Sequence, residues 1–190
     1  MVKERIPKRF GMHPINDIQL LCPMQRGGAG ARSLNTELQK VLNPRSVEGI
    51  VKFGQLFAVG DKVMQTENNY DKEVYNGDIG IITSINVQDQ EITIDFYDKV
   101  VTFDYTDLDQ ITLAYATTIH KSQGSEYPAV IIPITMQSYM ILRRNLIYTA
   151  ITRGKKLVIL IGQKKAIAMA VRDNKGSRRY SKLREWLQIV

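Results

Sequence analysis

The stretch that decides the fold is ATTIHKSQGSEYPAVIIPI, residues 116–134. Its second half leads into the apolar run AVIIPIT (residues 129–135), which is typical of a strand buried on both faces of a parallel sheet. Its first eleven residues crowd hydroxyl, imidazole, ammonium, amide and carboxylate groups together. Open α/β sheets bind their ligands at polar groups beside the strand ends. The stretch therefore predicts a buried strand with a functional turn in front of it.

Buried strands alternate with helices on both sides of this stretch. Upstream, IQLLC (residues 18–22) is followed by the glycine-rich turn PMQRGGAG and by apolar residues at helical spacing over residues 31–42. Residues 1–17 have the character of an irregular lead-in. Downstream, the patterns predict a helix, a third buried strand and two further helices over residues 138–152, 156–162, 164–173 and 180–187. This alternation predicts an α/β fold with a parallel sheet and helical crossovers.

A segment of different character interrupts this pattern. From residue 56 to about residue 105, short alternating runs are separated by turn residues such as Asn76-Gly77, which is typical of a small all-β barrel. We therefore expect three parts, at residues 1–55, 56–108 and 109–190. Alternation sends half of the aromatic residues of the barrel into its core. Tyr97 or Tyr105 remains a candidate for stacking on nucleic-acid bases.

Composition narrows the function classes. The 190 residues carry a formal charge of +7, which is compatible with a polyanionic partner such as nucleic acid but does not require one. No apolar stretch reaches the ~18 residues of a membrane helix, so we expect no membrane partner. The single cysteine, Cys22, excludes an internal disulfide and a cysteine-based zinc site, and favours a cytoplasmic setting. His13 has no second ligand nearby, so no metal site is predicted.

The polar turn allows two interpretations at this point. Thr117 or Thr118 is placed to cap a short helix through residues 120–123, and such a cap can simply face water. The N-terminus of a helix beside the end of a strand also favours the binding of phosphate. Arg153 likewise has two interpretations. It is either a cation that stabilises the C-terminal end of a helix or a clamp on a phosphoryl group during its transfer. The glycine-rich turn after residue 22 is not a Walker A loop, because no lysine follows its last glycine.

The order of the motifs resembles a known family. IQLLCPMQRGGAG, YNGDIG, LAYATTIHKSQGSEYPAVIIP and RRNLIYTAITRGKKLVILIG follow one another as in the C-terminal half of RecD/TraA-type superfamily 1 DNA helicases. The resemblance implies the second of two RecA-like motor domains, interrupted by an SH3-like barrel. It implies ATP bound between the two domains, single-stranded DNA lying across both, and movement from 5′ to 3′. Roles in DNA repair and recombination belong to the same expectation.

The resemblance also implies roles for particular residues. Arg153 corresponds to the arginine finger, and Arg26 to an arginine that also approaches the phosphates. The residues expected to bind the nucleotide are Gln123, Gly124 and Glu126, with Gln123 coupling the nucleotide to the DNA. The residues expected to contact the DNA backbone are Thr118, His120, Lys121 and Ser122.

Two ATPase motifs are absent from the sequence. No GxxxxGK[ST] loop occurs, and no Asp-Glu pair follows a buried strand. We therefore expect ATP and Mg²⁺ to be held mainly by an N-terminal motor domain of the same parent protein, and no ATP hydrolysis by this chain alone. Further candidate partners are the subunits of a nuclease complex. The alternatives are a stand-alone, non-catalytic nucleic-acid-binding module and a barrel that binds proteins. Arg153 and Glu126 favour the helicase, because a binding module does not need them.

Overall fold

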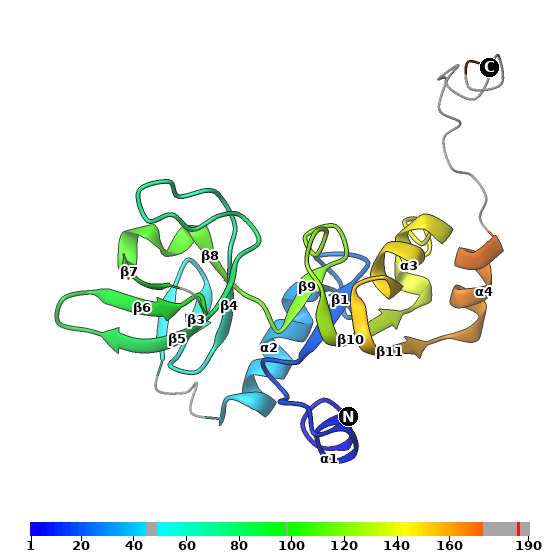
Figure 1. Ribbon diagram of the computed structural model, residues 1–190, viewed down its shortest axis with the longest axis horizontal. Helices are drawn as coiled ribbons and strands as arrows, with labels where there is room; N and C mark the ends of the chain where they lie inside the picture. The colour runs from blue at the N-terminus through cyan, green and yellow to red at the C-terminus, as the bar shows by residue number, and fades with distance from the viewer. Residues whose placement is uncertain (45–48, 98, 173–185, 187–190) are drawn as a thin grey trace.

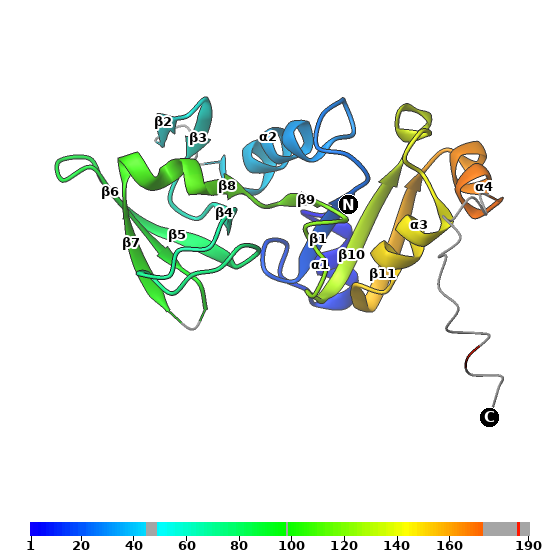
Figure 2. The same ribbon diagram turned by 90° about the horizontal axis from the view of Figure 1, so that it is seen from above.

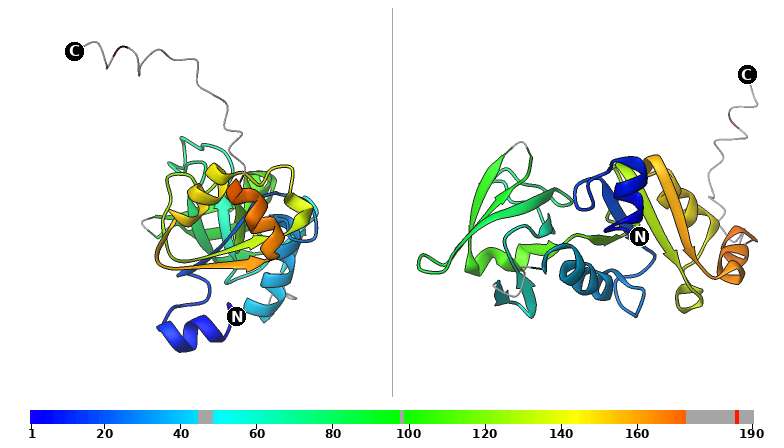
Figure 3. Two further views of the ribbon diagram at one scale, coloured as in Figure 1. Left: turned by 90° about the vertical axis from the view of Figure 1, so that its right-hand side faces the viewer. Right: turned by 90° about the horizontal axis from the view of Figure 1, so that it is seen from below.

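The computed structural model describes residues 1–44, 49–97, 99–172 and 186. A parallel and an antiparallel sheet lie side by side along the long axis of the molecule (Figures 1 and 3). The helices and strands are α1 (Arg5–Phe10), β1 (Ile18–Cys22), α2 (Ala31–Leu42), β2 (Ile50–Lys52), β3 (Gln55–Phe57), β4 (Lys62–Gln65), β5 (Ile79–Asn86), β6 (Glu91–Asp95), β7 (Val100–Asp104), β8 (Ile111–Leu113), β9 (Ala116–Thr118), β10 (Tyr127–Ile134), α3 (Arg144–Ile151), β11 (Gly154–Gly162) and α4 (Lys164–Arg172). The 3₁₀ helices η2 (Tyr105–Gln110) and η3 (Met136–Ser138) also occur.

The parallel sheet has the strand order β11-β10-β1-β9, and each neighbouring pair is parallel. Its central strands β1 and β10 are the two apolar runs expected from the sequence, and most of their residues are buried. On one face, Ile6 of α1 and Ala31 of α2 pack in a cluster with Leu20. On the other face, Leu146 of α3 and Ala170 of α4 share a cluster with the strands (Figure 2). The predicted parallel sheet with helical crossovers is confirmed.

The antiparallel sheet has the strand order β7-β6-β5-β4-β8. Burial alternates along β6 and β7, which sends Ile92, Ile94 and Phe103 into an enclosed core. The hairpin of β2 and β3 forms a separate two-stranded sheet. The predicted all-β interruption is confirmed, while its limits at residues 56–108 remain a prediction.

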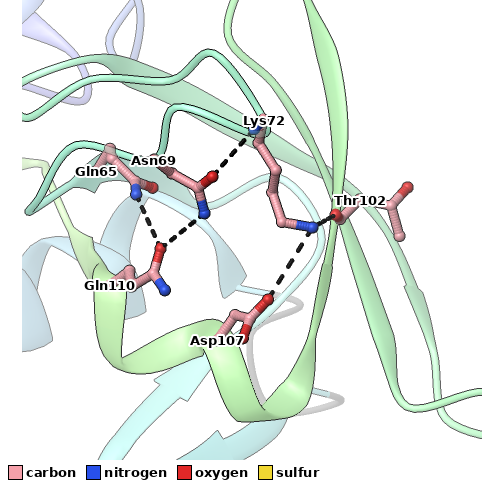
Figure 4. Close-up of polar contacts among 6 residues, drawn as sticks. All are labelled: Gln65, Asn69, Lys72, Thr102, Asp107 and Gln110. Atoms are coloured by element: carbon pink, nitrogen blue, oxygen red, sulfur yellow. Dashed lines mark hydrogen bonds and ion pairs between the residues drawn. The ribbon is translucent and has the colours of Figure 1, made fainter.

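A polar network holds the long loop between β4 and β5 against the antiparallel sheet (Figure 4). Lys72 Nζ donates to the carbonyl oxygen of Thr102 at 2.8 Å and lies 4.0 Å from Asp107 Oδ2. The side-chain amide of Asn69 donates to Gln110 Oε1 at 3.1 Å. These contacts connect the loop to β7 and η2, so hydrogen bonds hold a segment that has few apolar residues to bury.

Buried polar contacts join the two sheets through α2. The Asp61 carboxylate accepts hydrogen bonds from the side chains of Gln39, Asn43 and Tyr115 and from the backbone N–H of Ala58. Burial raises the pKa of Asp61, and these donors act against that rise by stabilising the charged form. Gln39 and Asn43 belong to α2 and its C-terminal cap, whereas Tyr115 lies between β8 and β9. Asp61 therefore fixes α2 to both sheets.

Two expectations about secondary structure were wrong near the chain's start and before α3. Residues 5–10 form helix α1 instead of an irregular lead-in, because Ile6 is buried and Gly11 ends the helix in the left-handed conformation. The helix expected from residue 138 begins at Arg144. The Ser138 hydroxyl instead donates to the carbonyl oxygen of Thr135 at the short helix η3. Local hydrogen bonds of this kind compete with helix formation.

The third strand differs from the expectation in its burial. β11 is an edge strand of the parallel sheet, so it pairs on one side only and its residues Leu160 and Ile161 are exposed. The helix expected over residues 180–187 lies outside the described residues, apart from residue 186. Among the described residues, we find no helix with the length and apolar character needed to cross a membrane.

Candidate nucleotide and nucleic-acid site

The polar turn runs from the carboxyl end of β9 to the amino end of β10. Both strands are parallel to β1. The turn therefore runs from the end of the sheet where the strands finish (the carboxyl edge) back to the end where the strands begin (the amino edge). Its first residues are fixed at the carboxyl edge, where the backbone N–H of Ile119 donates to the carbonyl oxygen of Cys22 at 2.9 Å. Its last residues lie at the amino edge, where the N–H of Tyr127 donates to the carbonyl oxygen of Arg153 at 2.8 Å. One turn therefore presents side chains at two separate places.

In the first half of this segment, residues 119–124 form successive hydrogen-bonded turns instead of the short helix expected over residues 120–123. The Thr118 hydroxyl accepts a hydrogen bond from the backbone N–H of Lys121 at 3.3 Å, as a capping residue would. Ile119 is fully buried and anchors the turn in the core. His120 and Lys121 are exposed, so they are accessible to a ligand.

Ser122, which was expected to contact the DNA backbone, is not available for that role. Its side chain is fully buried, and its hydroxyl donates to the carbonyl oxygen of Ile119 at 2.8 Å. A side chain in that position shapes the turn and is not accessible to DNA. Tyr105, one of the two candidates for base stacking, is buried as well, whereas Tyr97 is exposed.

Arg153 lies beside the second half of the turn. Its Nη1 donates to the carbonyl oxygen of Ser125 at 3.2 Å, and its Nε donates to that of Thr149 at 3.3 Å. Its Nη2 donates to the Thr152 hydroxyl at 3.3 Å. These partners are neutral, and within the described part of the chain Arg153 forms no ion pair. The guanidinium is thus oriented by the protein while its charge is left for another group.

Gly124 and Glu126 flank Ser125, whose carbonyl oxygen accepts a hydrogen bond from Arg153. Gly124 has a φ of +88°, a conformation that a residue with a side chain adopts only with strain. The Glu126 carboxylate forms an ion pair with Lys155 at 3.1 Å, and both side chains are more than half exposed. An exposed pair of this kind contributes little stability and can be exchanged for a ligand. Lys155 was not among the residues predicted from the sequence, although its position two residues after Arg153 was a usable signal.

A hollow of about 300 Å³ separates the turn from the start of α3. His120 and Gln123 line it from the turn, and Arg143 and Asn145 line it from the other side. Thr149, whose carbonyl oxygen binds Arg153, also lines it. Sequence reasoning did not single out Arg143 or Asn145, because the expected helix spanned them and hid the turn before Arg144.

The structure does not bring Arg26 and Arg153 together. Arg26 is exposed in the loop after β1, at the carboxyl edge, while Arg153 precedes β11 at the amino edge. Thr118 pairs with Cys22 in the sheet, so Arg26 shares its edge with Thr118 and His120. Two groups result: Arg26, Thr118, His120 and Lys121 at the carboxyl edge, and Gly124, Glu126 and Arg153 toward the amino edge. Among the residues that the structure describes, no cluster of three or more His, Cys, Asp or Glu is suited to hold a metal ion.

Two family models match the chain. The ATP-dependent RecD-like DNA helicase SH3 domain matches residues 34–96, and the UvrD-like helicase C-terminal domain matches residues 113–161. Together they cover most of α2, most of the antiparallel sheet, the polar turn and Arg153.

Two relatives cover most of this chain. The ATP-dependent RecD2 DNA helicase of Deinococcus radiodurans is 35% identical over 162 residues, which are 85% of this chain and 22% of the relative. The RecBCD enzyme subunit RecD of Mycolicibacterium smegmatis is 30% identical over 168 residues, which are 86% of this chain and 28% of the relative. The chain therefore spans only 22% and 28% of the lengths of these relatives.

Solved structures of Pif1 helicases share the fold. A structure of Bacteroides Pif1 helicase in complex with ADP-AlF3 and ssDNA has a TM-score of 0.55 at 19% identity, covering 84% of this chain and 44% of that one. Pif1 helicase from Candida albicans has a TM-score of 0.51 at 13% identity, covering 88% and 51%. The fold is thus the RecA-like sheet with an SH3-like interruption. The family models and the RecD relatives, and not these structures, make the chain a C-terminal portion of a superfamily 1 helicase. Within that class it belongs to the RecD-like helicases, as the motif order indicated.

Proposed function

We propose that this chain is the part of an ATP-dependent DNA helicase that supplies the arginine finger and one half of the track for single-stranded DNA. In this proposal the motor moves from 5′ to 3′ and works in the cytoplasm. The observation that carries the proposal is the polar turn that crosses from β9 to β10 (the crossing turn). It joins an exposed basic group at one sheet edge to an arginine at the other edge that the protein orients and that forms no ion pair among the described residues. A change in the nucleotide can then reach the DNA through one continuous segment.

The nucleotide side of the proposal consists of Gly124, Glu126 and Arg153. A charge of fixed position, held ready before the reaction, stabilises the negative charge that spreads over the transferring phosphoryl group. The bonds from Arg153 to Ser125 and Thr149 provide that fixed position. Glu126 would accept from ribose hydroxyls once it leaves Lys155, and Gln123 would connect this side to the DNA side.

The DNA side of the proposal consists of Thr118, His120 and Lys121. Arg26 was expected to approach the ATP phosphates, and we assign it to the DNA side instead because its loop lies at the same edge as Thr118. Hydroxyl, imidazole and cationic groups contact phosphate oxygens without reading the base sequence. This suits a motor that must move along any sequence. Ser122 supports this side only indirectly, by fixing the turn that presents His120 and Lys121.

The residues present fit only part of an ATP site. Arg153 offers a positive charge that has no ion-pair partner among the described residues, and Glu126 offers an exchangeable carboxylate, whereas a phosphate-cradling loop with its lysine is missing from the sequence. When bound, ATP with Mg²⁺ supplies the phosphoryl group that is transferred to water. We propose that a second motor domain holds most of both, and that this chain alone hydrolyses no ATP. Subunits of a nuclease complex are further proposed partners.

The decisive experiment replaces Arg153 in a helicase that contains this chain. Arg153→Lys should lower kcat for ATP hydrolysis by roughly 10³-fold or more, the range known for arginine fingers, and leave the Kd for single-stranded DNA unchanged. Arg172→Lys, at the exposed end of α4, is the matched control and should change neither quantity. Equal kcat for the wild type and Arg153→Lys would favour the alternative, a non-catalytic nucleic-acid-binding module.

The isolated chain provides a second test. It should show no magnesium-dependent ATPase activity with or without single-stranded DNA, and it should bind labelled oligothymidylate. His120→Ala together with Lys121→Ala should weaken this binding. A measurable ATPase rate for the isolated chain would contradict the proposed dependence on a second motor domain.

A further inference from the structure

A groove of about 650 Å³ lies between α2 and the hairpin of β2 and β3. Figure 2 shows the hairpin and α2 next to each other on the same side of the molecule. One wall is the exposed face of α2, where Arg32, Thr36 and Lys40 recur at a spacing of four residues. This row spans about 12 Å of helix. The other wall is the hairpin, with Phe53 at its tip.

The charge of the groove is positive. Among the described residues that line it, Arg32 and Lys40 are cationic and none is acidic. Lys40 does form an ion pair with Glu37 at 3.1 Å outside the groove lining, but both side chains are about two-thirds exposed. Such a pair is weak and can be exchanged for a phosphate. The groove therefore favours an anionic ligand.

Phe53 occupies an unfavourable backbone conformation. Phe53 and Gly54 are the two central residues of the hairpin turn, with φ values of +49° and +71°. Turns of this kind favour Asn-Gly, and a bulky residue with positive φ is strained. Phe53 is nevertheless 64% exposed, so burial does not explain why a phenylalanine stands there. Strained residues that gain nothing from the core are typical of binding sites.

The floor of the groove offers an unused donor. Gln55 accepts a hydrogen bond from the Thr112 hydroxyl at 3.2 Å through its Oε1, while its Nε2 is buried without a partner among the described residues. Buried donors are normally paired. A ligand with an acceptor oxygen or ring nitrogen would satisfy this group.

The groove is continuous with the carboxyl edge of the parallel sheet. Gln25, which lines the groove, belongs to the same loop as Arg26. A chain lying on the carboxyl-edge residues would reach the groove directly. Exposed aromatic rings combined with cations are the usual means of holding single-stranded nucleic acid.

We propose that this groove is a second binding site for single-stranded nucleic acid, in which Phe53 stacks on a base and Arg32 and Lys40 contact phosphates. It extends the proposed DNA track beyond the crossing turn, so it rests on the proposed function. A peptide is the alternative occupant. It is disfavoured because the described lining residues offer two cations and one exposed ring, which suit phosphates and a base, and no acidic group that would select a basic residue of a peptide.

The test measures binding of an oligothymidylate of about 16 nucleotides to the chain at several salt concentrations. Phe53→Asn should weaken binding about tenfold, because one stacking contact is lost, and should not lower the melting temperature, since asparagine suits the turn better. Phe10→Asn is the matched control, because Phe10 is also an exposed phenylalanine and lies on α1, outside the residues that line the groove. It should leave the affinity unchanged.

The charged residues give an independent readout. Arg32→Gln and Lys40→Gln, both on the exposed face of α2, should each reduce the slope of log K against log salt by about 0.7. If Phe53→Asn, Arg32→Gln and Lys40→Gln all bind like the wild type while His120→Ala with Lys121→Ala binds weakly, the groove proposal is overturned and the proposed function stands. If the wild type does not bind the oligonucleotide, the groove proposal is overturned as well.

Discussion

Lys62 is a buried lysine at the junction of the two sheets. It begins β4, yet its ammonium reaches the parallel sheet, where Nζ donates to the carbonyl oxygen of Ile15 at 2.8 Å and to that of Ile18 at 3.4 Å. It also lies 5.9 Å from the centre of the Tyr127 ring. Desolvation lowers the pKa of Lys62 to about 7, and the charge of Asp17 opposes this only in part.

The lowered pKa predicts a stability that depends on pH. Between pH 7 and 10.5 the unfolded chain holds the Lys62 proton and the folded chain does not, so stability rises with pH in this range. We expect the free energy of unfolding to rise by about 2 kcal/mol between pH 7 and pH 9, compared with Lys62→Met. Urea unfolding of both proteins at several pH values measures this difference. The same pH dependence in both proteins would contradict the assignment to Lys62.

At the scale of elements, the loop after β1 depends on close packing at Gly30. A Cβ atom at this position would lie 2.5 Å from the carbonyl oxygen of Arg26 and 2.8 Å from that of Gln25. The backbone of the loop would have to move, so we expect Gly30→Ala to lower the free energy of unfolding by about 1–3 kcal/mol and to displace Arg26. Urea unfolding gives the first quantity, and DNA affinity reports the second.

Gly28→Ala is the matched control for this prediction. Its Cβ would meet the side chain of Gln137 at 3.7 Å, which is an ordinary contact. Gly28→Ala should therefore leave both stability and DNA affinity close to the wild type. Equal losses in the two variants would mean that the glycine-rich loop needs flexibility at every position and not space at Gly30.

The elements differ in how well the sequence predicted them. The bounds of β1 and α2 matched, because their apolar patterns have a single interpretation: a continuous run for a buried strand and helical spacing over residues 31–42. Helix α1 was missed because its one buried residue, Ile6, gives no periodicity. The late start of α3 depends on hydrogen bonds around Ser138, which spacing alone does not reveal.

The residues of the candidate site, like the elements, were predicted only in part from the sequence. The motif order led to Arg153, and the structure places it in contact with Ser125 of the turn. The position of Arg26 at the opposite edge and the burial of Ser122 follow from which strands pair and which way the turn crosses. Such facts depend on tertiary contacts between distant parts of the chain, so spacing could not predict them.

At the scale of the whole molecule, the two sheets should unfold as one unit. The chain leaves the parallel sheet after α2 and returns at β9, and Asn35 of α2 spans that return. Its Nδ2 donates to the carbonyl oxygens of Leu113 at 2.8 Å and Ala116 at 2.9 Å, and its Oδ1 accepts the N–H of Ala116 at 2.7 Å. Because Asn35 is buried, these groups have no access to water if its side chain is removed.

Asn35→Ala should therefore separate the two sheets energetically. In the wild type, the slowest-exchanging amides of β6 and β10 should report the same free energy of opening, because both sheets open together. In Asn35→Ala the two values should differ by about 2 kcal/mol, the cost of leaving buried polar groups unpaired at the junction. Asn86→Ala is the control, since Asn86 bonds to Asp89 within the β5–β6 turn and touches only the antiparallel sheet. If the two sheets stay equally protected in Asn35→Ala, the Asp61 and Lys62 contacts suffice to couple them, and the groove beside α2 keeps its alignment with the carboxyl edge without Asn35.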